Sequence, residues 1–536
     1  MCAGIFASLA LALPPLTPGV PASVASLRMR DLAALEHGVV ASKDPDVVQP
    51  LPAPLPAGSA KNEAETEDET PAAEAPHYGL TALGAALALL GGTAWYWRES
   101  DFNSRDWALH WDWPSWKAKL VTFDAVRLDD NHFDTNAFWH PLDGAGVYLI
   151  ARGNGFKPGP STAIVAAFSL VWEYLIEFRE YPSVNDMLVT PLAAISLAEP
   201  AVRLADLLRA GTQGPVKKSV AAVLDPVGTT NDLIRGERRP PASETNTWGL
   251  PTTYRHRLDV FVGLGRTDYG AGRQRTEGDF GADVFVDATP GFGREGRGWR
   301  VTGPGALNFL AGGASVSGSR LVAAAAVGKV SLVGAQWRHF EDVGPEPHGQ
   351  ALFAGLATGF EYATRSSPTS SSDQLANLRV IGPMVEGTLA RGPLRVDFVT
   401  DAAWDFAMVH PFGASPADLS ATGIPTVIAN EGYYYAQGLS LAARLRVGYG
   451  RWDLGLDAGE DVFRPIGTLD RYRVPAVAGT SDHRGRRRLW VGVRPWVRWP
   501  LRVMVAADQW IRDGRFGASS AASSELRGST SLGLIF

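Results

Sequence analysis

The second half of the chain alternates between apolar and polar residues, and this alternation constrains the fold more than any other feature of the sequence. Leu441, Leu445 and Val447 fall on one face of an extended chain, and Arg444 and Arg446 fall on the other. A period of two residues predicts a β-strand. The run reaches roughly the nine to eleven residues that a tilted strand needs to cross a bilayer, whereas ordinary globular strands have about five or six. A soluble β-sandwich would not need strands of this length.

Similar runs recur up to the last residue, and counting back from Phe536 predicts twelve strands. They are expected at 526–536, 501–512, 487–498, 452–463, 431–448, 394–407, 376–390, 350–363, 330–340, 319–327, 279–289 and 255–265. The Gly-rich stretch 290–318 is left unassigned, so ten or fourteen strands remain alternatives. The predicted fold class is α+β multidomain: a small all-α helical domain followed by a C-terminal antiparallel transmembrane β-barrel of about twelve strands.

Loop lengths alternate as in outer-membrane barrels, which have short turns at one rim and long loops at the other. Tight turns are expected near 391–393, 449–451 and 499–501, and long connections at 410–430, 464–486 and 513–524. The final alternating residues and the terminal aromatic Phe536 resemble the last strand of outer-membrane barrels. The expected location is the outer membrane of a Gram-negative bacterium. Its lipid is one expected partner, and the barrel-assembly machinery, engaged through the strand ending in Phe536, is the other.

The N-terminal part is predicted to carry export and linker segments. Residues 1–26 hold an apolar stretch and then small residues, as a signal peptide does, and they include the chain's single cysteine, Cys2. Residues 27–76 are rich in Pro, Ala and Glu and are predicted to be a disordered linker, because they cannot bury enough apolar surface to fold.

A helical domain in the periplasm is predicted for residues 77–236, a linker for 237–254 and the barrel for 255–536. The first helix of the helical domain, Tyr78–Trp97, has twenty residues without a charge. It could be a packed helix of a membrane-associated bundle or an inner-membrane anchor. Known plugged barrels have about twenty-two strands, so the helical domain is expected below the barrel and not inside it.

Charged residues are predicted to fill the lumen. If the apolar faces meet lipid, the inward residues include Arg444, Arg446, Asp453, Asp457, Arg494 and Arg498. Opposite charges on paired strands attract, and Arg can bind a carboxylate through two hydrogen bonds. The lumen is therefore expected to be narrow or plugged, with a small-solute channel as the alternative. The net charge of −6 gives no reason to expect nucleic acid as a partner.

Two carboxylates, Glu173 and Glu177, stand one turn apart in an apolar helix that is predicted to begin at a Ser161 cap. The preceding helix brings His140, Gly144, Tyr148 and Arg152 to one face, and Gly144 would allow close helix packing. Ser183 and Asp186 read as the cap and the capping-box acid of the next helix, which Pro191 is expected to kink.

This stretch resembles the bacterial family called domain of unknown function 3943. The matching residues are Asn136, His140, Pro141, Gly144, Tyr148, Ala151, Arg152, Ser169, Trp172, Glu173, Glu177, Pro182, Ser183, Asn185 and Asp186. Ala198-Glu199 stands where the family has Gly-Glu, and Leu224–Gly236 is similar to its closing Asn-Pro segment, with Asp225 for Asn. The resemblance implies an envelope barrel and brings no established activity and no catalytic residues.

The polar residues leave three interpretations open. The first is a buried structural network in which Arg152 is the counterion of a Glu, with Asn136 and Asn185 taking part. The second is a membrane-surface hydrolase using His140, Glu173 and Asp186, with Glu177 as a further candidate. The third is a metal site. The sequence has no nucleophile elbow, P-loop or zinc-ligand spacing, so a non-enzymatic envelope protein without a cofactor is expected, its helical domain serving as a docking or lipid-contacting platform.

Overall fold

The chain is seen here in a computed structural model that describes most residues after position 74. The described residues are 75–99, 108–212, 214–236, 242, 244–252, 254–270, 272–289, 296–341, 348–366, 373–412, 414, 427–466, 479–496 and 499–536. The predicted signal peptide and almost all of the predicted disordered linker lie outside them.

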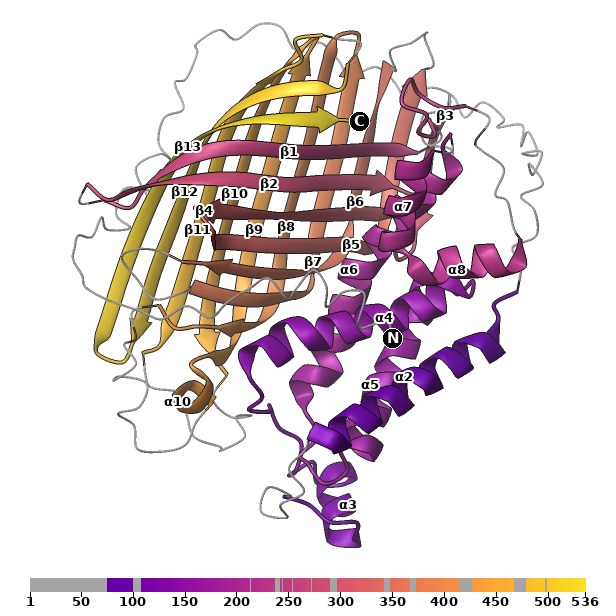
Figure 1. Ribbon diagram of the computed structural model, residues 1–536, viewed down its shortest axis with the longest axis vertical. Coiled ribbons are helices and arrows are strands. Elements are labelled where there is room, and N and C mark those ends of the chain that lie inside the picture. The colour runs from indigo at the N-terminus through magenta and orange to yellow at the C-terminus, as the bar shows by residue number, and fades with distance from the viewer. Residues whose placement is uncertain are drawn as a thin grey trace, which may run out of the picture. The chain divides into compact units, whose positions relative to one another are not determined.

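A closed antiparallel β-barrel forms the C-terminal part of the described chain (Figure 1). Its strands are β1 (Arg255–Asp268), β2 (Gln274–Asp287), β4 (Leu307–Ser317), β5 (Arg320–Glu341), β6 (His348–Arg365), β7 (Asp373–Arg391), β8 (Leu394–Val409), β9 (Tyr434–Tyr449), β10 (Trp452–Pro465), β11 (Ser481–Val493), β12 (Leu501–Phe516) and β13 (Ser519–Ile535). β13 pairs with β1 and closes the ring. The predicted barrel of about twelve strands, preceded by helices, is confirmed.

The number of strands was predicted correctly through two errors that cancel. The segments 319–327 and 330–340 are not two strands but the single long strand β5, whose pairing with β6 shifts at a bulge between Ser331 and Val333. The unassigned Gly-rich stretch contains the missing ring strand, β4. It also contains β3 (Gly296–Thr302), which pairs with the second half of β5 while β4 pairs with the first half.

Two predicted strand ends are also wrong. The expected long connection at 513–524 is a tight hairpin between β12 and β13, in which Gly517 adopts a positive φ of 58°. Glycine tolerates that conformation without a steric penalty. The strand expected at 487–498 ends at Val493.

The helices precede the barrel in the chain. They are α2 (Tyr78–Glu99), α3 (Trp113–Leu120), η2 (Thr135–Trp139), α4 (His140–Gly153), α5 (Pro158–Val171), η3 (Trp172–Ile176), α6 (Val184–Ala210), α7 (Pro215–Leu224) and α8 (Pro226–Arg235), and a short α10 (Val427–Glu431) follows β8. η2 and η3 are π-helical turns. Ser161 is not a cap, because α5 already begins at Pro158 after Lys157. α6 runs on through Pro191 and Pro200.

The helices do not lie below the barrel as expected, because α6 packs on the outer side of its wall. Several wall residues that pack with α6 lie on one hydrogen-bonding row, in which each residue pairs with the next: Leu258, Val284, Leu310, Gly328, Phe360, Leu378, Phe406 and Gln437. Side chains alternate along a strand, and Val260 and Val262, in step with Leu258 on β1, are 43% and 60% exposed. This outer row therefore faces away from the lumen.

The length of α6 matches the outer row. Its 27 residues give a helix of about 40 Å, and eight adjacent strands span about 34 Å across their hydrogen bonds. Leu258 lies near the start of β1 and Gln437 near the start of β9, and these two strands begin at opposite rims. α6 therefore crosses the wall nearly from rim to rim, transverse to β1, β2 and β4 (Figure 1).

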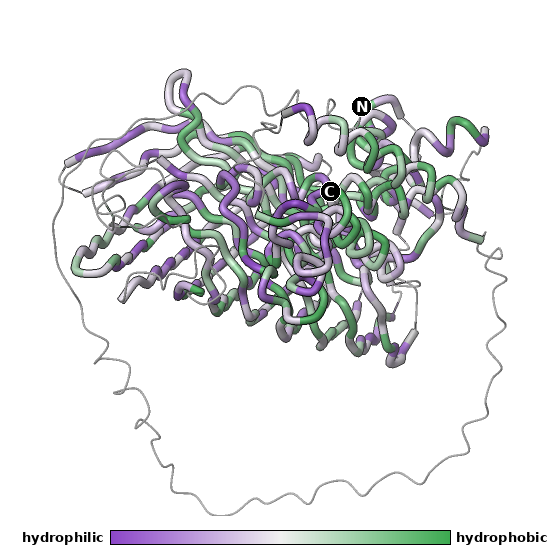
Figure 2. The backbone as a smooth tube through the Cα atoms, turned by 90° about the horizontal axis from the view of Figure 1, so that it is seen from below, coloured by the Kyte–Doolittle hydropathy of each residue, from purple (hydrophilic) through white to green (hydrophobic). Residues whose placement is uncertain are grey.

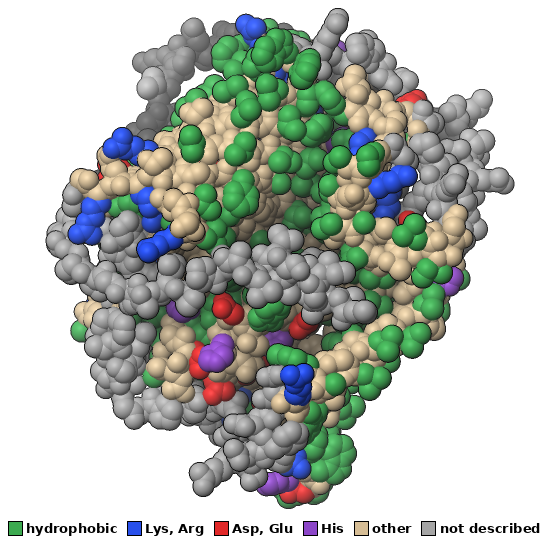
Figure 3. Space-filling view, viewed as in Figure 1, with side chains coloured by type: hydrophobic (Ala, Val, Ile, Leu, Met, Phe, Trp, Pro, Cys, Tyr) green, Lys and Arg blue, Asp and Glu red, His purple; other side chains and the backbone are tan. Residues whose placement is uncertain are grey.

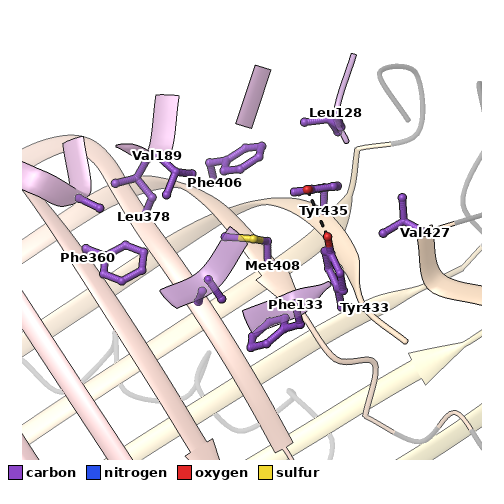
Figure 4. Close-up of a cluster of buried hydrophobic side chains, with 13 residues drawn as sticks. Leu128, Phe133, Val189, Phe360, Leu378, Phe406, Met408, Val427, Tyr433 and Tyr435 are labelled. Carbon is purple, nitrogen blue, oxygen red and sulfur yellow. Dashed lines mark hydrogen bonds between the residues drawn. The ribbon is translucent and has the colours of Figure 1, made fainter. Parts of the chain in front are cut away.

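Three apolar clusters join α6 to the wall. Near its N-terminus, Val189 and Ala193 pack with Phe360, Leu378 and Phe406 (Figure 4). In the middle, Ala194, Ala198 and Val202 pack with Val330 of β5. Near its C-terminus, Leu204, Ala205 and Leu208 pack with Val284, Val286 and Leu310. Burial of this apolar surface, at roughly 25 cal/mol per Å², holds the helices to the barrel.

Candidate functional site at the helix–barrel junction

Three chain segments bring polar side chains together where α6 begins. Asp129 follows α3, His140 opens α4, and Asp186 lies in the first turn of α6. One ligand atom from each of the three lies within 4.8 Å of the others, and His140 Nε2 is 3.5 Å from Asp186 Oδ1. The Asn185 amide nitrogen donates to both aspartates, at 3.2 Å to Asp129 and 2.9 Å to Asp186. We call these residues, with Asn136 and Glu173, the junction cluster.

Two tyrosines of the barrel complete the junction cluster. The Tyr435 hydroxyl donates to Asp129 Oδ1 at 2.7 Å, and the Asn136 amide nitrogen donates to the same oxygen at 2.6 Å. The Asn136 amide also lies 3.0 Å from the Tyr433 hydroxyl. Tyr433 and Tyr435 stand side by side with their hydroxyls in contact (Figure 4). The cluster therefore links the helices to the start of β9 through hydrogen bonds.

Glu173 and Glu177 have separate roles. Glu173 is 2% exposed and accepts a hydrogen bond from the Ser183 backbone nitrogen at 2.6 Å. The Ser183 hydroxyl caps α6 by accepting from the Asp186 nitrogen at 3.3 Å. The second bond of the capping box thus comes from Glu173 on a neighbouring helix and not from Asp186. Glu177 accepts from the Trp172 indole at 2.8 Å across the π-helical turn η3.

Arg152 is not the counterion of Glu173, so that expectation is wrong. Its guanidinium binds Glu199 through two bonds, Nε to Oε2 at 2.7 Å and Nη2 to Oε1 at 3.2 Å. Arg203 and the Tyr148 hydroxyl bind the same carboxylate at 2.7 and 2.9 Å. Glu199 is fully buried. This second network lies nearly four turns further along α6, because Glu199 is thirteen residues after Asp186.

A buried lysine near the end of α3, Lys119, interacts electrostatically with Glu173 and Glu177. It is 1% exposed, and its ammonium has no hydrogen-bond partner among the described residues. It lies 5.9 Å from the centres of the Trp116 and Tyr174 rings. Burial lowers the pKa of Lys119 to about 8, and the charges of Glu173 and Glu177 oppose this shift.

The predicted lumen residues are only partly paired with one another. Arg444 binds Asp457 at 2.6 Å on the neighbouring strand. Arg446 binds Asp259 and Asp283 and not Asp453. Arg494 follows the end of β11 and donates to the Gly450 carbonyl oxygen. Arg498 lies outside the described residues.

Sequence reasoning missed three members of the site. Asp129 stands in the Leu128–Asn131 stretch just before the residues of the family pattern, and Tyr433 and Tyr435 belong to a run of three tyrosines at the start of β9. The adjacent acids and the tyrosine run were visible signals. Neither reveals that segments about 300 positions apart meet, because that contact depends on the helices packing on the outer wall.

Residues 125–227, which include the helical part of the junction cluster, match the model of a family described as a domain of unknown function (DUF3943). A search of curated proteins found no match.

Among solved structures, the chain is similar to the translocator domain of the autotransporter NalP from Neisseria meningitidis, with 13% identity and a TM-score of 0.20, over 59% of this chain and 97% of that one. It is also similar to in-vitro folded OmpT of Vibrio cholerae, with 7% identity and a TM-score of 0.20, over 55% and 99%. It is similar as well to the outer membrane channel DcaP of Acinetobacter baumannii, with 12% identity and a TM-score of 0.20, over 55% of this chain and 100% of that one. Scores this low support no argument about function.

Proposed function

We propose that this chain, whose residues 125–227 match the DUF3943 family model, is an integral outer-membrane protein. Its function would depend on the helices outside the twelve-strand barrel and not on transport through the lumen. The helices form a lipid-contacting layer on the outer wall, and the role is non-enzymatic. The observation that carries the proposal is the docking of α6 along the outer row, nearly from rim to rim.

The lumen supports this reading because ion pairs bridge it. β2 and β9 lie six places apart in a ring of twelve, so they are diametrically opposite. Asp283 of β2 nevertheless binds both Arg444 and Arg446 of β9, at 2.9 and 3.1 Å. Phe285, Phe309 and Phe353 fill the interior nearer the rim where β1 begins. A cavity of about 310 Å³ remains beyond the bridge, lined by charges of both signs such as Arg486 and Glu361.

The helices have the composition that a lipid-facing layer needs. Within the described residues, three segments are long and apolar enough to span a membrane: Tyr78–Arg98, Pro158–Ile176 and Val184–Ala210. The outermost, α2, leaves Leu83, Leu87 and Leu90 more than half exposed, and hydrophobic side chains follow it along the surface (Figure 3). Figure 2 shows the same contrast along the chain, with apolar residues concentrated in the helices and alternating in the strands.

The helix directions are consistent with crossings that begin and end at the same rim. Gly144 meets Thr190 and Arg152 meets Glu199, so α4 runs parallel to α6. Ser169, near the end of α5, meets Asp186 at the start of α6, so α5 runs antiparallel to α6. Gly84 of α2 meets Ile150 near the end of α4, and Gly92 meets Trp172 just after α5, so α2 points in the same direction as α5. Small residues at these contacts are typical of helices packed in membranes. The N-terminal end of α2 and the C-terminal end of α6 therefore lie toward the rim where β1 begins.

The rim where α6 begins carries the long connections after β8 and β10, and the one long connection of the opposite rim, between β2 and β4, contains the strand β3. In outer-membrane barrels the longer loops are extracellular. The junction cluster would then lie at the outer leaflet, and the chain would enter and leave the helical layer on the periplasmic side. A layer hanging wholly in the periplasm would leave the exposed leucines of α2 in water.

Site-directed spin labelling tests this placement. The only natural cysteine, Cys2, is removed by Cys2→Ser, and single cysteines then replace Leu87 on α2, Leu441 on the bare barrel wall and His132, whose side chain is 86% exposed. In liposomes, the label at Leu87 should match the one at Leu441: relaxed by oxygen and shielded from a water-soluble nickel chelate. A Leu87 label as open to nickel as the His132 label would place the helices in water and overturn the proposal.

Planar-bilayer recording tests the lumen separately. The purified chain should give no steady conductance, because the bridge from Asp283 to β9 closes the interior. A reproducible open channel would favour the narrow-channel function instead. The membrane-surface hydrolase remains a second candidate because His140 and Asp186 meet, although Glu173 is engaged by the Ser183 amide.

A further inference from the structure

The junction cluster gathers three buried acidic side chains in one place. Asp129, Glu173 and Asp186 are 8%, 2% and 4% exposed. No Lys or Arg of the described chain lies within ion-pair distance of these three carboxylates. The other buried carboxylates of the helical layer differ, since Glu199 binds Arg152 and Asp225 binds Arg209. Buried charges need compensation, because moving an unpaired carboxylate out of water is costly.

Two buried polar atoms of the cluster also lack hydrogen-bond partners within the described part of the chain. His140 Nε2 has no solvent contact and no hydrogen bond, and it faces Asp186 Oδ1 at 3.5 Å. Asn136 is 1% exposed, and its side-chain oxygen accepts nothing while its nitrogen is bound to Asp129. Buried polar atoms are almost always satisfied. Buried nitrogen and oxygen atoms without hydrogen bonds, beside carboxyl groups that have no Lys or Arg partner, point to a missing positive ligand.

We propose that Asp129, His140 and Asp186 bind a divalent first-row transition-metal ion at the helix–barrel junction. An imidazole with two carboxylates suits ions such as Zn²⁺ or Mn²⁺ better than it suits Mg²⁺, which prefers oxygen ligands alone. Zinc bonds of about 2.0–2.2 Å to nitrogen and oxygen place tetrahedral ligands about 3.4 Å apart. The 3.5 Å from His140 to Asp186 fits this spacing, and all three ligand atoms lie within 4.8 Å.

The surrounding hydrogen bonds are those that hold metal ligands in place. Asp129 is oriented by Tyr435, Asn136 and Asn185, and Asp186 by Asn185. Such outer contacts fix ligand geometry and tune affinity. Because Tyr435 belongs to the barrel while His140 and Asp186 belong to the helices, the bound ion would tie the helical layer to the wall. This inference does not rest on the proposed lipid contact.

The test is metal binding by the full chain in mild detergent. After EDTA treatment, titration with Zn²⁺ should show one site per chain, and a large excess of Mg²⁺ should not compete. His140→Gln and Asp186→Asn should each weaken Zn²⁺ binding at least tenfold. Asp206→Asn, which removes an acid near the other end of α6, twenty residues after Asp186, is the control and should bind as the wild type does.

Protection of the junction from protease provides a second readout, independent of any activity. Zn²⁺ should raise the protease resistance of the wild-type helical layer and leave that of His140→Gln unchanged. Heat-modifiable gel mobility confirms that each variant has a folded barrel. Absence of a Zn²⁺ site in the wild-type chain, or binding that survives both ligand substitutions, would overturn the proposal. Stronger binding of Mg²⁺ than of Zn²⁺ would overturn the assignment of the metal class.

Discussion

Gly328 of β5 faces the backbone carbonyl of Ser196 in α6 with no space for a side chain between them. A Cβ added at Gly328 would lie 2.1 Å from the Ser196 oxygen. Gly328 lies in the middle of the outer row, where it pairs with Leu310 of β4 and Phe360 of β6. The helix therefore packs against the wall backbone to backbone at a glycine, with no room for a side chain between them.

Replacing Gly328 by Val should push α6 away from the wall. Overpacking of this kind costs typically about 1–3 kcal/mol, and limited proteolysis should cut the helical layer while the barrel keeps its heat-modifiable mobility. The control is Gly528→Val on β13, where an added Cβ has nothing within 4 Å. Equal protease resistance of Gly328→Val and the wild type would show that α6 does not rest on β5.

Glu199→Gln should destabilise the helical layer much more than Glu173→Gln. Loss of the Glu199 charge leaves Arg152 buried without a counterion, and breaking such a pair costs about 3–5 kcal/mol. Gln at position 173 can still accept from the Ser183 amide, and it removes one charge from beside Asp186. Denaturant titration followed by tryptophan fluorescence checks the order. A larger loss for Glu173→Gln would contradict the separation of the two networks.

Tyr434 and Tyr435 are adjacent in β9, but substituting them should destabilise different parts of the protein, because their side chains face opposite sides of the wall. Tyr435→Phe removes a hydrogen-bond donor to the buried Asp129 carboxylate, which should cost about 1–3 kcal/mol of stability. This variant should make the helical layer more sensitive to protease. Tyr434→Phe removes the donor to Asp482 and should lower the melting temperature of the barrel instead. The same response from both variants would argue against this two-sided wall.

The buried charge on Lys119 should lower the free energy of unfolding of the chain below about pH 8. Its pKa is lowered by burial to about 8 in the folded chain and returns to the usual value near 10.5 on unfolding. Between these values the unfolded chain binds more protons, so stability should rise with pH. Lys119→Met should therefore stabilise the chain at pH 7, and its advantage should shrink by pH 10.

The matched control for that pH series is Lys117→Met, which changes an exposed lysine of the same helix. It should leave the free energy of unfolding nearly unchanged at both pH values. An advantage of Lys119→Met that stays constant from pH 7 to pH 10 would mean that the lysine does not titrate in this range.

The sequence alone determined the barrel, because strand alternation is a local property. Leu441, Leu445 and Val447 must share one face of any extended chain, whatever lies around it. Strand boundaries were less secure. β5 was split in two and β4 was missed, since Gly- and Ala-rich strands carry little contrast between their faces. The family pattern likewise indicated which helical residues matter, from His140 to Asp186, without saying what they contact.

Tertiary structure decided everything that depends on distant segments meeting. The partners of Arg152, Glu173 and Asp129 lie 47, 10 and 306 positions away in the sequence. Which carboxylate forms an ion pair or caps a helix therefore depends on which one the tertiary packing brings within hydrogen-bonding distance. The side of the wall that the helices cover also could not be read from the chain, since an apolar strand face suits lipid and a helix equally well. Only the packing of α6 along the outer row, with Gly328 under Ser196, distinguishes the two.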